Sequence, residues 1–95
     1  MNASTIATTA RSFGFTKVNP IDSGFNAGGV FVWLWTRGAR SHSSDDAYLF
    51  FRDGKVHGPR PDCQSMWSDR GCADIEAVRA ELLAAKSHRL TSHVR

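Results

Sequence analysis

Residues 30–36 (VFVWLWT) give the strongest β-strand signal in this chain. β-Branched and aromatic side chains favour extended backbone, so the segment is predicted to be a β-strand. Successive side chains of a strand point to opposite faces. An antiparallel strand with one face in water normally has polar residues there. Here one face is aliphatic and the other aromatic: Val30, Val32 and Leu34 against Phe31, Trp33 and Trp35. We therefore expect either that both faces are covered or that one face is an exposed aromatic surface.

A β-hairpin is predicted after a polar loop over residues 37–46. The segment 47–52 (AYLFFR) is again rich in aromatic residues, and Asp53-Gly54 is typical of the type I′ turn that joins two antiparallel strands. Lys55–His57 is the predicted return strand. Pro59 is expected to end it, because proline has no N–H for the ladder.

Two further segments are less regular. Residues 15–18 are predicted to be extended, up to the Asn19-Pro20 dipeptide. Residues 62–71 show no clear period. A short helical turn through Met66 and Trp67 fits there, since Pro61 suits the first position of a helix.

A helix is predicted near each end of the chain, over residues 4–13 and 74–88. The first has apolar residues at helical spacing, a cap at Asn2 or Ser4 and a stop at Gly14. The second has acidic residues at its start and basic residues at its end, which complements the helix dipole. The apolar faces comprise Ile6, Ala10 and Phe13, and Ile75, Val78 and Leu82.

Together these elements predict an α+β fold: a small antiparallel sheet of three to four strands, with an N-terminal and a C-terminal helix packed on it. We assign residues 1–89 to a single α+β domain and residues 90–95 to a basic flexible tail.

The net charge of +3 comes from the last ten residues, which hold three basic and no acidic side chains, while residues 1–85 are balanced. A nucleic-acid-binding domain usually concentrates Lys and Arg on one face. The predicted order of elements is similar in topology to the double-stranded RNA-binding domain. However, Asp74 and Glu76 lie where that domain grips phosphate. Nucleic-acid binding is therefore an alternative and not the favoured interpretation.

The two cysteines, Cys63 and Cys72, are too few for a disulfide scaffold. No secretory signal is visible before Phe15, and no apolar run approaches the roughly 20 residues that cross a bilayer. We expect a cytoplasmic protein with reduced thiols and no membrane contact. A single bridge between Cys63 and Cys72 is the open alternative.

Patterns typical of catalysis or metal binding are missing. The cysteines are nine residues apart, not two to four as in structural zinc sites. The Ser, His and Asp residues of segment 42–46 are adjacent in one loop, whereas triads are assembled from distant segments. The glycine-rich segment 24–29 precedes a strand, the reverse of a phosphate-binding loop. We predict no catalytic residue, no metal and no cofactor. A cysteine-dependent enzyme using Cys63 and His57 is the enzymatic alternative.

The aromatic residues and arginines favour a binding protein, because Trp, Tyr and Arg dominate the energetics of many protein interfaces. The expected partner is a protein or a nucleoprotein complex, and a homodimer through the sheet face would satisfy the same pattern. The predicted contact set is Trp35, Arg37, Arg40, Arg52, Arg60 and Trp67.

The protein is a small α+β chain that is rich in aromatic residues and arginines and lacks a catalytic constellation. In this general build it resembles the small inhibitor proteins of phages and mobile elements. The anti-CRISPR proteins are the clearest such group. The resemblance covers size and composition and rests on no residue motif. It implies a non-catalytic protein that docks on a protein or nucleoprotein complex and inhibits or modulates it. The balanced charge of the body implies steric blocking and not mimicry of DNA.

Overall fold

The computed structural model describes residues 2–35, 47–60 and 63–94. Its strands form one antiparallel sheet in the order β1-β2-β3-β4-β5, so each strand pairs with its neighbours in sequence. The α+β class is confirmed, but the sheet has five strands in place of the three to four predicted. The elements are α1 (Ala3–Ser12), β1 (Val18–Pro20), β2 (Val30–Trp35), β3 (Ala47–Arg52), β4 (Lys55–Arg60), β5 (Cys63–Gly71) and α2 (Ile75–Val94).

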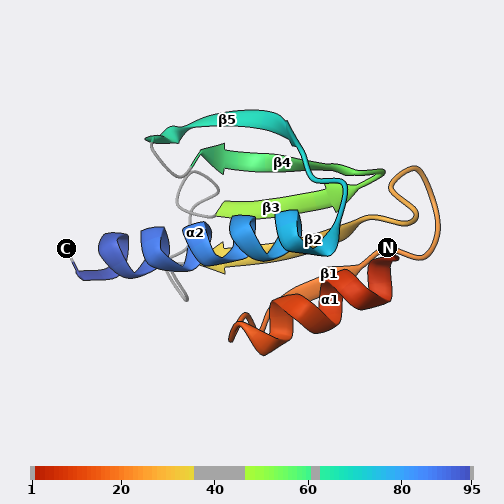
Figure 1. Cartoon of the computed structure of the whole chain (residues 1–95), viewed down its shortest axis with the longest axis horizontal. Coiled ribbons are helices and arrows are strands. Elements are labelled where there is room, and N and C mark those ends of the chain that lie inside the picture. The colour runs from red at the N-terminus through yellow and green to blue at the C-terminus, as the bar shows by residue number, and fades with distance from the viewer. Residues whose placement is uncertain (1, 36–46, 61–62, 95) are drawn as a thin grey trace.

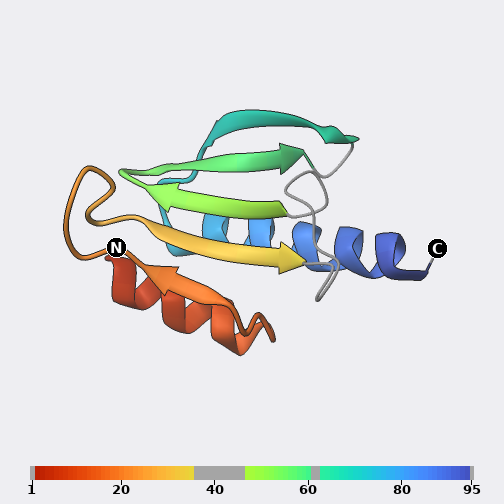
Figure 2. The ribbon, with the colours of Figure 1, turned by 180° about the vertical axis from the view of Figure 1, so that it is seen from behind.

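Both helices lie on the same side of the sheet. In Figure 1, α2 crosses in front of the strands and α1 lies beside β1. In Figure 2, which shows the molecule from behind, no helix of the described chain lies in front of the strands. The fold thus has two layers, and one side of the sheet carries no layer among the described residues.

The core fills the space between the sheet and the helices. It is built from alternate positions of β2 and β3, which are at most 2% exposed at Leu34, Leu49 and Phe51. These side chains pack against the apolar faces of the helices, among them Ile6 of α1 and Leu82 of α2. Burial of each such side chain stabilises the fold by about 1.5–3 kcal/mol, which holds the two layers together.

The ends of α1 follow the predicted chemistry. The Asn2 side chain accepts a hydrogen bond from the Thr5 N–H at 2.9 Å, so Asn2 is the cap. Gly14 has a φ of 97° and ends the helix, as expected for a residue without a Cβ. Phe15 then folds back, donates its N–H to the Ala10 carbonyl at 3.2 Å and joins the core at 2% exposure.

The hairpin of β3 and β4 is also confirmed. Asp53 and Gly54 have φ values of 52° and 76°, the left-handed backbone that a type I′ turn requires. Arg52 pairs with Lys55 across the turn. The predicted polar loop over 37–46 lies outside the described residues.

Beyond the hairpin the structure corrects two predictions. β4 continues through Pro59 to Arg60, past its predicted end, and residues 63–71 form β5 where a helical turn was proposed. The Cys72 N–H donates to the Gly54 carbonyl at 2.8 Å, in register with the β4–β5 pairs. Ladder bonds alternate along antiparallel strands, so Gly58 bonds to β5, whereas the ring nitrogen of Pro59 points toward β3. The pairing of β4 with β3 ends at His57, so no β4–β5 bond depends on an N–H at Pro59.

The bounds of β1 and α2 also differ from the predicted ones. β1 starts at Val18, where the predicted extended segment ends, and it includes Pro20. α2 starts after Asp74, whose carboxylate accepts from the Ala77 N–H at 2.9 Å. It continues to Val94, past the predicted end at His88 and through residues assigned to the tail. No glycine or proline interrupts this stretch, so nothing local stops the helix. The division into domain and tail stays a prediction.

A partly buried ion pair connects α2 to β5, at the edge of the sheet. Arg70 of β5 contacts Glu81 of α2 through two hydrogen bonds, Nε to Oε2 at 3.0 Å and Nη2 to Oε1 at 2.8 Å. Arg70 Nη1 also donates to the Gly58 carbonyl at 3.1 Å. The side chains are only 21% and 17% exposed. Such bidentate pairing has a defined geometry, so it fixes α2, which packs on β2, relative to β5.

Candidate functional site

The side of the sheet that no described helix covers carries a continuous surface of aromatic rings from four strands. All of these side chains are partly exposed, and Trp67 reaches 37% exposure. This selects the second alternative for β2: one face is buried under the helices and the other is an exposed aromatic surface. The members, which we call the aromatic face, are Phe31, Trp33, Tyr48, Phe50, His57 and Trp67.

Strand register brings these rings together. Phe31 pairs with Phe50, Phe50 pairs with His57, and Trp33 pairs with Tyr48. Paired residues of antiparallel strands point to the same side of the sheet with Cβ atoms about 5 Å apart. The aromatic face is therefore a consequence of the pairing and not of any one strand.

The rings contact one another in favourable geometries. Phe31 and Phe50 are stacked, with ring centres 4.5 Å apart and planes 30° apart. Tyr48 contacts three other rings of the cluster edge-on. Its ring centre lies 5.2, 5.1 and 4.9 Å from those of Phe31, Trp33 and Trp67. Each such pair contributes about 0.5–1.5 kcal/mol beyond the area it buries. The face is thus pre-organised.

The charged groups beside the aromatic face have neighbours that engage them. Lys17 Nζ lies 5.1 Å from the centre of the Trp33 ring. Asp69 contacts His57 across the strands, with 2.5 Å between Oδ1 and Nδ1. Arg52, at the turn end of β3, pairs with Asp53 at 3.0 Å. These contacts leave the surface apolar at its centre with basic and acidic groups at its border.

A further aromatic side chain borders the face near the end of β3. Phe25, in the loop between β1 and β2, is 93% exposed. Arg52 Nη1 donates to the Phe25 carbonyl at 2.9 Å, and the guanidinium lies 5.8 Å from the ring centre. The loop is also closed on itself, since Ile21 and Gly29 are bridged by a hydrogen bond of 2.8 Å. Phe25 is therefore held in place while its ring faces solvent.

The structure places part of the predicted contact set. Trp67 belongs to the aromatic face and Arg52 borders it, whereas Arg60 is exposed at the opposite end of the hairpin from the turn. A register shift in β2 sets Trp35 opposite Ala47, and its side chain lies outside the described part of the chain. Arg37 and Arg40 also lie outside it. The contacts proposed for these three residues stay predictions.

Sequence reasoning missed five members of the aromatic face as site residues. The signal for some of them was present. The turn at Asp53-Gly54 sets Arg52 opposite Lys55, which in turn sets Phe50 opposite His57 with Tyr48 on the same side. The missed residues are Phe31, Trp33, Tyr48, Phe50 and His57.

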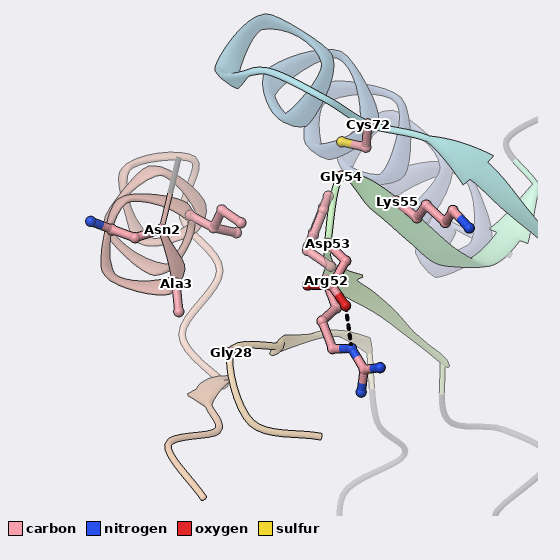
Figure 3. A pocket seen from close by; sticks show the side chains of 10 residues that line it. Asn2, Ala3, Gly28, Arg52, Asp53, Gly54, Lys55 and Cys72 are labelled. Carbon is pink, nitrogen blue, oxygen red and sulfur yellow. Dashed lines mark hydrogen bonds and ion pairs between the residues drawn. The ribbon is translucent and has the colours of Figure 1, made fainter. Parts of the chain in front are cut away.

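A separate cavity of about 270 Å³ opens between α1 and the turn of the β3–β4 hairpin. Figure 3 shows the side chains that line it. Asn2, Ala3 and Ile6 line one wall and residues 52–55 line the other. Cys72 also lines the cavity. Arg52 and Asp53 in the wall are already paired with each other.

Cys72 is a free thiol that is 2% exposed, so the bridge between Cys63 and Cys72 is not formed. Burial raises the pKa of its thiol to about 11, and the nearby carboxylates of Glu81 and Asp74 add to the effect. The thiolate is the reactive form of cysteine. At neutral pH Cys72 is therefore a protonated core residue and a poor nucleophile.

The raised pKa of Cys72 predicts a loss of stability at alkaline pH. The unfolded thiol loses its proton near pH 9.0 and the folded thiol only near 11, so the folded state holds the extra proton between these values. Stability is complete below pH 9 and falls by about 1 kcal/mol for each pH unit above it, up to pH 11. Urea unfolding from pH 8 to 11 measures this loss. The Cys72→Ala variant should lack it, and an equal loss in both proteins would assign it to other groups.

Two further findings concern only the described ranges, with their gaps at 36–46 and 61–62. No three His, Cys, Asp or Glu side chains gather there as a metal site would require. No helix among them has the length and apolarity needed to cross a membrane.

Comparisons with family models, curated proteins and solved structures find no match to this chain. Its function must therefore be argued from its own geometry.

Proposed function

We propose that this protein is a non-catalytic binding protein that docks on a protein partner through its aromatic face. The observation that carries the proposal is the set of mutually packed, partly exposed rings on the side of the sheet that no described helix covers. Large contiguous apolar surfaces usually mark interaction sites in proteins. Trp and Tyr are also the residues that most often become hot spots.

Two features favour a protein partner over a nucleic acid. Base stacking needs free ring faces, but Phe31 and Phe50 stack on each other and Lys17 covers one side of Trp33. Phosphate binding needs an excess of cations on the contact surface. Here the carboxylates of Asp53 and Asp69 offset the cations at the border.

The resemblance in general build to anti-CRISPR-type inhibitors leads us to extend the proposal. Docking would inhibit or modulate the partner, which is a protein or the protein part of a nucleoprotein complex. A rigid surface suits steric blocking, because pre-organised side chains lose little conformational freedom on binding.

The test is affinity capture from the native host with the wild-type protein and two variants. Trp67→Ala removes a ring of the aromatic face, and Leu83→Ala removes a side chain that is 59% exposed on α2, on the other side of the molecule. A hot-spot truncation costs at least 2 kcal/mol, so Trp67→Ala should weaken binding of a captured protein by about 30-fold. Leu83→Ala should bind like the wild type.

Circular dichroism and thermal melting of both variants establish that they fold. Trp33→Ala, checked in the same way, is a second probe of the aromatic face. A partner that binds both Trp67→Ala and Trp33→Ala as tightly as the wild type would contradict the proposal. Titration with oligo(dT) and oligo(U), followed by tryptophan fluorescence, tests the nucleic-acid alternative. We expect no saturable change, whereas salt-sensitive binding that depends on Trp67 would favour nucleic acid.

A further inference from the structure

The two edges of the sheet differ in how they are protected. β1 is three residues long, contains Pro20 and has α1 packed beside it. Short strands, proline and a covering helix are common means of preventing further pairing at an edge. β5 is nine residues long and contains neither proline nor lysine. No described strand or helix lies beyond it in either view of the fold.

Among the described residues no strand pairs with the outer side of β5, which presents its backbone groups in a defined row. The hydrogen bond from Cys72 to Gly54 fixes the alternation of the ladder, so Ser68 and Arg70 bond to β4. The N–H and C=O groups of Trp67, Asp69 and Gly71 therefore point away from the sheet.

The charged side chains that would protect this edge are engaged elsewhere. Arg70 is held by Glu81 under α2. Asp69 contacts His57 on the aromatic face, although its carboxylate is still 72% exposed. The neighbouring apolar residues are open instead, with Met66 at 55% and Trp67 at 37% exposure.

We propose that β5 is a site for β-strand addition, at which an extended segment of the partner pairs with the outer edge of β5 and lays alternate side chains beside the aromatic face. The inference rests on the proposed function and specifies its binding mode. Backbone hydrogen bonds supply affinity in this mode, and side chains at every second position supply specificity. The segment should place an apolar residue opposite Trp67 and a basic residue opposite Asp69, two positions away.

A second copy of this chain fits the same edge less well. Antiparallel self-pairing that uses all three outward residues has its two-fold axis at Asp69. It therefore sets the Asp69 carboxylates of the two copies directly opposite each other, and like charges in that position are destabilising. A segment with a basic residue there removes this repulsion.

Hydrogen exchange of the free protein is the first test. The N–H groups of Trp67, Asp69 and Gly71 should exchange much faster than those of Ser68 and Arg70. Similar rates in the two sets would overturn the proposal, because the outer edge would then be paired or covered.

Binding is tested with short linear peptides selected from a random displayed library against the wild-type protein. Asp69→Pro removes an outward N–H, and Asp69→Ala is the matched control that loses the same carboxylate but keeps the N–H. We expect a selected peptide to bind Asp69→Pro about tenfold more weakly than Asp69→Ala. Exchange at the three outward N–H groups should slow when the peptide is bound. Thermal melting of both variants shows whether they fold.

The outcomes separate this inference from the proposed function. Equal binding to Asp69→Pro and Asp69→Ala, with binding lost in Trp67→Ala, would overturn strand addition and leave the aromatic face as the docking surface. A library that yields no binding peptide would also overturn strand addition. Binding that is indifferent to all these variants would contradict both proposals. A dimer in sedimentation experiments that Asp69→Pro dissociates would assign the edge to a second copy.

Discussion

Replacing Gly58 by alanine should destabilise the protein by about 3 kcal/mol, because a Cβ at this position has no space. It would lie 2.7 Å from the carbonyl oxygen of Tyr48 and 2.6 Å from Cδ2 of Leu49. The carbonyl is backbone of the adjacent strand β3 and cannot turn aside as a side chain can. Relief of the clash therefore requires β3 and β4 to move apart, under the tightly packed Leu49.

Gly71→Ala is the matched control for Gly58→Ala. Gly71 is also a strand residue, in β5, and a Cβ there meets no atom within 4 Å. We expect its stability to be unchanged or raised by about 0.5 kcal/mol, because alanine lowers the conformational entropy of the unfolded chain. Urea unfolding of both variants measures the difference. Similar stabilities for the two would refute the steric argument.

Arg70→Ala should also destabilise the protein by about 3 kcal/mol, since it leaves a charge without its partner in a poorly solvated place. Glu81 would remain under α2 with its carboxylate 17% exposed. The Gly58 carbonyl, which accepts from Arg70 Nη1 at 3.1 Å, would lose that donor. Denaturant unfolding at neutral pH measures the loss.

The double variant Arg70→Met with Glu81→Met sharpens the prediction. Apolar replacement of both members of a buried ion pair is often neutral, so the double variant should be more stable than Arg70→Ala. Arg52→Ala serves as the comparison at the surface. Its partner Asp53 is 78% exposed, so we expect a loss below about 1 kcal/mol. A double variant no more stable than Arg70→Ala would contradict the argument that the unpartnered Glu81 carboxylate causes the loss.

Each proposal about function depends on the sheet, and the sheet was only partly predictable. Asp53-Gly54 predicts the hairpin because the turn chemistry and its flanking strands are adjacent in sequence. β5 carries no such local signal. Its sequence, CQSMWSDRG, is polar and aperiodic, and its backbone becomes a strand because β4 offers a row of hydrogen-bonding partners.

The candidate site shows the same division. The alternation of β2 alone predicts that one of its faces is aromatic, but it leaves open whether that face is covered. The contribution of His57 and Trp67 depends on β4 and β5 lying next to β3, which involves residues distant in sequence. The outward N–H groups of β5 follow from the register of the ladder and from no property of the side chains.

Local sequence was therefore enough to predict the two-sided character of β2, the turn at Asp53-Gly54, the limits of α1 and the α+β class, because these depend on neighbouring residues and on side-chain alternation. Long-range packing sets which side of the sheet the helices cover and places Pro59 within a strand. It also brings rings from four strands together on a face that no described helix covers, beside an edge that no described strand pairs with. Those features depend on long-range strand pairing, in which the backbone of each strand is satisfied by partners that its own sequence does not specify.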